Sequence, residues 1–223
     1  MYIGEHEFLR WLHVLAMVYW LGGEWGVFQT SYQVANPRLS LEERRRHMET
    51  AYRIDILART GIILLLPLGL HMGHNFGAHP WGMQFVTVAW ILTAGWLTLT
   101  WAAFIKRDTD TGLKLTIWDE RIRYVLIPLL AGTAIVSLIR GAPFTMGWYA
   151  TKVLIYSGLL VIGLGLRVIM RHWVTIFRQI AAEGATPALE QRLASELSMG
   201  RGLAYVYWIG IGTVALLGIA KPF

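Results

Sequence analysis

The chain has 223 residues, of which 55% are hydrophobic and only 15% are charged, and it contains no cysteine. This composition argues against a soluble domain and predicts an all-α, polytopic membrane helix bundle, with residues 1–223 forming a single transmembrane domain. The lack of cysteine excludes disulfides, iron–sulfur clusters and covalently attached c-type haem. Most of the net charge of +6 lies in loops between apolar runs, which argues against nucleic acid as a partner and leaves the lipid bilayer.

Six apolar runs come close to the roughly 20 residues that a helix needs to cross a bilayer. They cover residues 8–30, 54–76, 84–105, 122–139, 148–170 and 202–220. The first run has no basic leader and no small-residue cleavage site, so we interpret it as a span rather than a signal peptide. The sequence therefore predicts about six transmembrane helices.

Basic residues are concentrated in three of the five connections. Segments 31–53, 106–123 and 171–201 each carry at least four Lys or Arg, whereas 77–83 and 140–147 hold only Arg140. The positive-inside rule then places the three basic segments in the cytoplasm and both termini outside. The expected location is the cytoplasmic (inner) membrane of a bacterium.

Segment 171–201 is long enough to hold structure of its own. Ile176 and Ile180 recur at helical spacing between charged residues, which predicts a helix lying on the cytoplasmic membrane surface. Thr186 is expected to cap a second short helix over residues 187–198.

Three histidines lie within the first two apolar runs, near the outer end of each. Ionisable groups inside a bilayer are costly, so His13, His71 and His74 are candidate functional residues. Two facing imidazoles between apolar helices are typical of haem iron. We therefore predict one haem b on the outer side, with His13 and His71 as axial ligands and His74 as the alternative to His71.

Basic residues are predicted at the same depth as these histidines. Arg10 and Arg140 lie at the outer boundary and Lys152 lies one turn inside it, where they are candidates to bind haem propionates. No histidine pair occurs near the inner side, which limits the prediction to one haem. His6 and His79 are expected to be solvated.

The polar residues of three helices each follow one helical stripe, and we expect the three stripes to face one another inside the bundle. The stripes are His13, Trp20 and Glu24; Thr60, Leu64, Pro67, His71 and His74; and Lys152, Tyr156, Leu159, Gly163 and Arg167.

A second polar group is predicted toward the inner side. It comprises Glu24, Arg59 and Arg167. An unpaired charge would be costly there, so we expect an ion pair between Glu24 and either Arg167 or Arg59. The alternatives are that Arg59 extends to the inner interface, or that the group forms a proton path or a polar substrate pocket.

Short motifs in helices one, two and five resemble the CopD/HemJ-like superfamily of haem-binding integral membrane proteins. His13 followed by Trp20 and two glycines resembles the first helix of these proteins. Residues 48–54 resemble the entry to helix two of HemJ-type protoporphyrinogen oxidases. Gly147-Trp148-Tyr-Ala-Thr-Lys152 resembles their Gly-Trp-x-x-x-Lys motif. The run from Arg10 to His13 is also similar to the start of the PuuD membrane domain.

This resemblance implies a haem b protein in which His13 corresponds to the family histidine of helix one and Lys152 to the motif lysine. The chain departs from the HemJ type in several ways. It is predicted to have six helices where those enzymes resemble a four-helix core, and it has Ala150 where their motif often carries histidine. The His71 and His74 pair is an addition.

The function that we favour from the sequence is electron transfer by a membrane-embedded b-type haem protein. The expected partner is quinone or quinol or a periplasmic electron carrier, and other membrane subunits or further copies of this chain are the expected assembly partners. One alternative is a HemJ-like protoporphyrinogen IX oxidase, with Lys152 or Arg59 binding tetrapyrrole carboxylates. Others are CopD-like copper transport through His71, Met72 and His74, and a structural membrane subunit.

Overall fold

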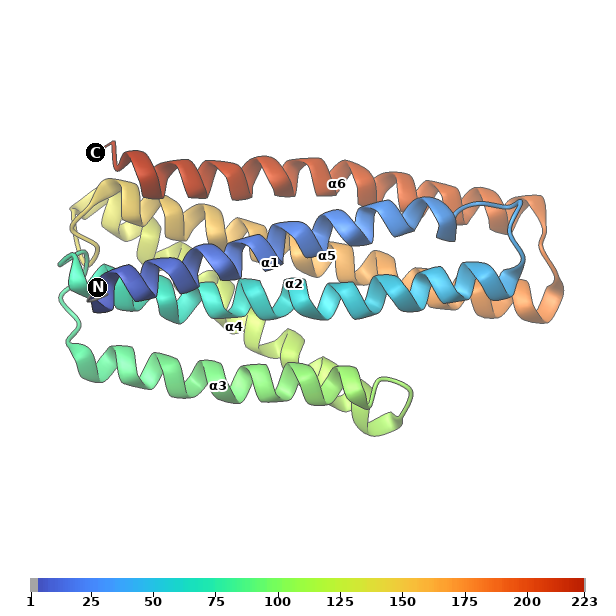
Figure 1. Ribbon diagram of the computed structural model, residues 1–223, viewed down its shortest axis with the longest axis horizontal. Coiled ribbons are helices and arrows are strands. Elements are labelled where there is room, and N and C mark those ends of the chain that lie inside the picture. The colour runs from blue at the N-terminus through green and yellow to red at the C-terminus, as the bar shows by residue number, and fades with distance from the viewer. Residues whose placement is uncertain (1–3, 223) are drawn as a thin grey trace.

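The computed structural model describes residues 4–222, which form six long helices joined by short connections (Figure 1). The helices are α1 (Glu5–Val34), α2 (Leu41–Asn75), α3 (Met83–Ile105), α4 (Asp110–Arg140), α5 (Gly147–Glu183) and α6 (Pro187–Ala220). Neighbours in the chain are neighbours in space, and α6 closes the ring against α1. Both chain ends lie at one end of the bundle, here called the terminal end, and the opposite end is called the distal end.

Helices α2 to α6 are each long and apolar enough to cross a membrane, which supports a multi-pass membrane bundle. Helix α1 does not reach this level. Its apolar stretch after Arg10 is interrupted by His13, Glu24 and the glycines at 22, 23 and 26. Five candidate spans are therefore established by length and composition. A sixth span through α1 and the side of the membrane on which the termini lie remain predictions.

Small residues bring α1 and α2 into close contact. A Cβ atom at position 23 would lie 2.8 Å from the Cβ of Ala58, and one at position 61 would lie 3.1 Å from the Cβ of Trp20. Glycine at both positions lets the two backbones approach, as is common between membrane helices. This packing fixes the height of Trp20 relative to α2.

Two helices begin well before the predicted boundaries, because polar caps start them. Helix α2 begins at Leu41 rather than 54, where Ser40 and Glu43 form a capping box. The hydrogen bonds from the Ser40 side chain and backbone lower the pKa of Glu43. Helix α4 begins at Asp110 rather than 122, where the Thr109 hydroxyl accepts a hydrogen bond from the Gly112 N–H. With 35 residues, α2 is about 52 Å long, well beyond the ~30 Å of a hydrocarbon core.

The predicted surface segment 171–201 is instead the continuation of α5 and α6. Thr186 does cap a helix, with its hydroxyl accepting a hydrogen bond from the Leu189 N–H, but that helix runs on to Ala220. The apolar stripe of α5 packs against a matching stripe of α6 that includes Leu193, so Ile176 is fully buried in protein rather than facing lipid.

The loop between α3 and α4 lies far short of the distal ends of α2, α5 and α6 (Figure 1). The distal parts of α1, α2, α5 and α6 therefore form an extension with an apolar core of its own. Arg44, only 3% exposed, holds it together. Its guanidinium donates to the Val34 carbonyl at 2.9 Å and to both carboxylate oxygens of Glu190 at 2.7 and 2.9 Å.

Replacing Arg44 with alanine is expected to destabilise the distal extension by about 2–4 kcal/mol, because the partly buried Glu190 loses its partner. Arg46→Ala is the matched control, since Arg46 pairs with Glu42 on the exposed face of the same helix and its loss should cost less than about 1 kcal/mol. Thermal unfolding in detergent, followed by tryptophan fluorescence, compares the two variants. Equal unfolding midpoints for the two variants would show that Arg44 does not stabilise the distal extension.

Candidate functional site

A cavity of about 370 Å³ lies near the terminal end, among α1, α2, α5 and α6, and we call it the terminal cavity. Its volume falls within the range of small-molecule sites. The walls are mainly apolar and aromatic. They include Met17, Trp20, Leu65, Leu66, Met72, Phe76, Leu130, Trp148, Tyr149, Val153, Tyr156 and Ile211. The basic and titratable groups that line it are His6, Arg10, His13, Lys152 and Lys221.

His13 presents its imidazole to the terminal cavity from α1. The ring lies against Gly69 of α2, where an added Cβ atom would be 3.8 Å from Cε1. Nδ1 is buried and has no hydrogen-bond partner within residues 4–222. Buried polar atoms are nearly always paired, so an unpaired imidazole nitrogen beside a cavity favours a ligand that satisfies it.

Three basic side chains from three helices line the same cavity: Arg10 of α1, Lys152 of α5, and Lys221 just after α6. A Cβ atom at position 218 would lie 2.6 Å from Nζ of Lys152, so glycine there leaves room for the ammonium group. Nζ of Lys221 lies 4.0 Å from the centre of the Phe76 ring. In the part of the chain that the structure describes, none of the three forms an ion pair with a carboxylate. This basic set suits the acidic groups of a ligand.

The other predicted site residues at this end do not line the cavity. Nε2 of His71 lies 2.9 Å from Oε1 of Glu5, and its Nδ1 accepts a hydrogen bond from the Trp90 indole at 3.4 Å. The ring of His74 faces that of His79, with 6.1 Å between centres. Arg140 is exposed at the end of α4. The structure therefore brings His13, Arg10 and Lys152 together, but neither His71 nor His74 faces His13.

The orientation of α2 explains this difference. Its predicted stripe from Thr60 to His74 faces α3, where Trp101 donates to the Thr60 hydroxyl at 3.0 Å and Trp90 contacts His71. The stripe that faces the interior is apolar, and it comprises Ile62, Leu66, Gly69, Gly73 and Phe76. Periodicity identifies residues that share a face, but it does not say which neighbouring helix covers that face.

His79 differs from the prediction of a solvated loop residue. It is only 4% exposed, and its Nε2 lies 2.9 Å from the Leu70 carbonyl oxygen. The aromatic rings of Trp81 and Phe85 pack around it. The buried His79 side chain therefore anchors the loop after α2 to that helix.

A second, smaller cavity of about 70 Å³ lies farther toward the distal end, and we call it the polar cavity. The charged residues that line it are Glu24, Asp55, Arg59, Arg123, Arg167 and Arg201. The predicted inner group of Glu24, Arg59 and Arg167 is therefore brought together. The predicted ion pairs are not present, because Arg59 pairs with Asp55 and Arg167 pairs with Asp119.

Asp119 is the buried anion that the sequence prediction missed. One of its carboxylate oxygens accepts hydrogen bonds from the Trp96 indole at 2.7 Å and the Thr100 hydroxyl at 2.9 Å. The other accepts from Arg167 at 2.5 Å and lies 3.6 Å from Nε of Arg123. Segment 106–123 was predicted to be a loop because it is rich in charge. The i,i+4 spacing of Asp119 and Arg123 was the signal that it is helical.

Two aromatic side chains separate the two cavities. Trp20 lines the terminal cavity, and its indole N–H donates to the hydroxyl of Tyr207 at 3.2 Å. Tyr207 lines the polar cavity. The rings pack edge to face with 5.4 Å between centres. The two cavities are thus close neighbours along the bundle axis.

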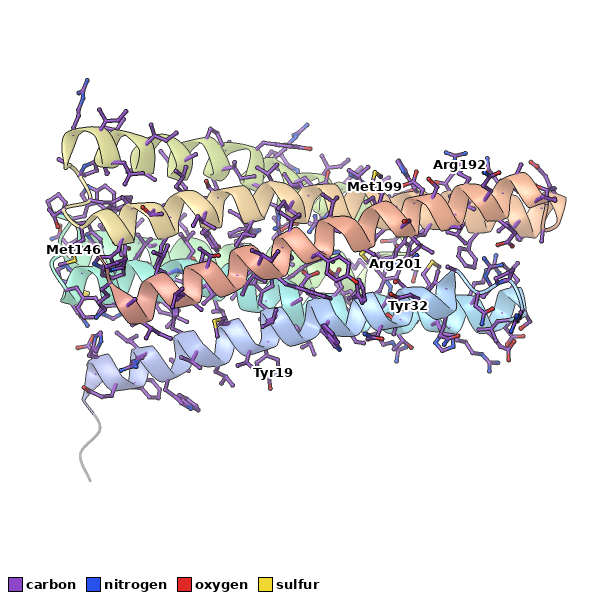
Figure 2. All side chains as sticks on the ribbon, turned by 90° about the horizontal axis from the view of Figure 1, so that it is seen from above. Tyr19, Tyr32, Met146, Arg192, Met199 and Arg201 are labelled. Atoms are coloured by element: carbon purple, nitrogen blue, oxygen red, sulfur yellow. The ribbon has the colours of Figure 1, made fainter. Side chains whose placement is uncertain are left out.

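Arg201 lies at the edge of the polar cavity between α6 and α1. Its guanidinium carbon is 4.7 Å from the centre of the Tyr32 ring, and Figure 2 shows the two residues between these helices. One of its terminal nitrogens, Nη1, has no hydrogen-bond partner within the described residues.

No family model matches this sequence, and neither a curated protein nor a solved structure is significantly similar to it. The site must therefore be interpreted from its own geometry.

Removing the charge of Asp119 is expected to be among the most destabilising single substitutions. Asp119→Asn leaves Arg123 without its buried counter-charge and Arg167 with only the more distant Glu120, 3.8 Å away, at a cost of about 3–5 kcal/mol. Asp110→Asn, at the exposed start of the same helix, should cost less than about 1 kcal/mol. The yield of monodisperse protein and the thermal midpoint in detergent measure both. A normal midpoint for Asp119→Asn would show that this network is dispensable.

Proposed function

We propose that this chain is a membrane-embedded b-type haem protein that takes part in electron transfer, with the porphyrin in the terminal cavity. One observation carries the proposal: a single cavity combines an unpartnered imidazole, apolar and aromatic walls and three basic side chains without carboxylate partners. Haem b requires an axial ligand, an apolar slot and cations for its propionates. The residues present fit one axial imidazole, from His13, rather than the pair predicted from the sequence.

Each group has a distinct role in this proposal. His13 would bind the iron, while Lys152, Arg10 and Lys221 would pair with the propionates. Bound haem iron would supply one-electron chemistry. Met17 and Met72 also line the cavity, so a thioether is available as a second axial ligand. Arg140 has no part in this arrangement.

A lipid-soluble quinone or quinol is the partner that we propose. The cavity is lined by Val14 of α1 and Ile219 of α6, which are 48% and 77% exposed. The cavity therefore reaches the lipid-facing surface between these two helices, where a quinol would arrive from the bilayer. The bias of Lys and Arg toward the distal loops supports a cytoplasmic membrane with the terminal end outside.

The second candidate is oxidation of protoporphyrinogen IX in the manner of the HemJ type. A cavity that presents His6, His13 and several cations also suits a tetrapyrrole substrate bound by its carboxylates. Copper transport has less support, because His71 contacts Glu5 and Trp90 while His74 faces His79.

The proposal predicts that haem content depends on His13 alone among the membrane histidines. His13→Ala should abolish the reduced-minus-oxidised haem spectrum of the purified protein, because His6, the other imidazole that lines the cavity, lies about 10 Å farther toward the terminal end. His71→Ala and His74→Ala are matched controls and should retain at least most of the haem. A featureless spectrum of the unaltered protein from haem-replete cells would rule out the proposed function. Haem loss in His71→Ala would restore the two-histidine prediction.

The basic residues of the terminal cavity should determine how tightly the haem is retained, because they are proposed to bind its propionates. Lys152→Met and Lys221→Met are each expected to weaken haem retention about tenfold, as expected for loss of a hydrogen bond to a charged group. Lys106→Met, in the exposed α3–α4 loop, is the control and should leave retention unchanged. The rate of haem transfer to apomyoglobin measures retention. Equal rates in all three variants would exclude these lysines as propionate ligands.

A further inference from the structure

Glu24 is a partly buried acidic side chain of the polar cavity that the ion-pair network does not use. It lies on α1 one turn beyond Trp20 and lines the polar cavity, and in the described residues it forms no ion pair. The charged and titratable groups that face it across the cavity are Asp55, Arg59, Arg123, Arg167, Arg201 and Tyr207.

The balance of positive and negative charge around the polar cavity indicates a role for Glu24. Asp55 is matched by Arg59, and Asp119 is shared by Arg123 and Arg167. The buried Glu120 lies 3.8 Å from Arg167 and 3.2 Å from Arg171, so Asp55, Asp119 and Glu120 face five guanidinium groups when Arg201 is included. Among the described residues, Nε and Nη2 of Arg123 have no hydrogen-bond partner, although this side chain is only 3% exposed. The guanidinium groups are therefore in excess over the carboxylates that bind them. An ionised Glu24 offsets this excess, and a protonated Glu24 leaves it uncompensated.

The terminal cavity lies close enough to respond to that charge. Trp20 and Tyr156 of the terminal cavity donate hydrogen bonds to Tyr207 and to the Ile62 carbonyl, both of which line the polar cavity, so the two cavities are one side-chain layer apart. Charges interact strongly across buried side chains, because little water screens them. An added electron in one cavity and an added proton in the other therefore stabilise each other.

The proton must come from the distal side. An indole N–H donates but does not accept, so the hydrogen bond from Trp20 to Tyr207 does not relay a proton from the terminal cavity. The hydroxyl of Tyr156, which also lines that cavity, donates its proton to the Ile62 carbonyl oxygen at 2.7 Å. The polar cavity has room for several water molecules, and Arg201 and Tyr32 lie at its edge between α6 and α1. Water on that side can reach Glu24 without passing Trp20.

We propose that Glu24 takes up one proton from distal water when one electron enters the terminal cavity. The electron comes from the quinol or carrier of the proposed function, on which this inference rests. The carboxylate of Glu24 becomes a carboxylic acid, and no other bond is formed or broken in the chain. The protein would thus couple electron transfer on one side of the bundle to proton uptake from the other.

The test is the pH dependence of the haem midpoint potential. In the unaltered protein it should fall by about 59 mV per pH unit where Glu24 titrates, which corresponds to one proton per electron. Glu24→Gln has nearly the same shape and should make the potential independent of pH while the haem spectrum is retained. Glu7→Gln, at the exposed start of the same helix, is the control and should keep the full slope.

The outcomes separate the two proposals. Absence of haem would overturn the proposed function. A haem whose potential does not depend on pH in the unaltered protein, or a full slope in Glu24→Gln, would overturn the role of Glu24. An infrared pH titration of the haem-free protein gives an independent measurement: a protonated carboxyl band that is missing in Glu24→Gln supports the role, and identical titrations of the two proteins would overturn it.

Discussion

The burial of Asp119 is the interaction on which the rest of the structure depends. Its two carboxylate oxygens bind side chains of α3, α4 and α5, so a single anion fixes the α3–α4 hairpin against the remainder of the bundle. The same contacts hold Arg123 and Arg167 at the wall of the polar cavity. A buried charge is tolerated only when it is paired and hydrogen-bonded, and this constraint determines which parts of α4 and α5 must meet.

The two cavities differ in how their charges are satisfied. Around the polar cavity most guanidinium groups already have carboxylate partners, and Glu24 remains. Around the terminal cavity His13 and the basic residues have no such partners in the described chain. A stable fold requires buried charges that are paired within the protein. Unpaired charges beside an apolar cavity indicate instead a ligand that pairs with them. This contrast is the reason for placing a cofactor in the terminal cavity and a titrating group in the polar cavity.

The number and order of the helices could be predicted, because apolar runs of bilayer length and breaks such as Gly184 to Pro187 are local signals. The stripes of α1 and α5 were also identified, and they bring His13 near Lys152. The lengths of α2, α4, α5 and α6 were underestimated, since polar helical turns beyond the bilayer look like loops when only hydropathy is considered. The rotation of α2 about its axis could not be predicted. It is set by hydrogen bonds from Trp101 and Trp90 of α3 to Thr60 and His71, and the spacing of residues along α2 carries no information about such partners.

The rotation of α2 has a chemical consequence. With His71 turned toward α3, the wall of the terminal cavity on α2 consists of Leu66, Gly69, Gly73 and Met72 rather than a second imidazole. Glycine at position 73 also admits the Tyr149 side chain, since a Cβ atom there would lie 2.6 Å from its hydroxyl. A thioether from Met17 or Met72 could therefore bind, together with His13, the iron of a haem held in this cavity. Thioether ligation raises the potential of a haem iron. Whether a methionine binds the iron would thus distinguish a carrier of electrons from an oxidase.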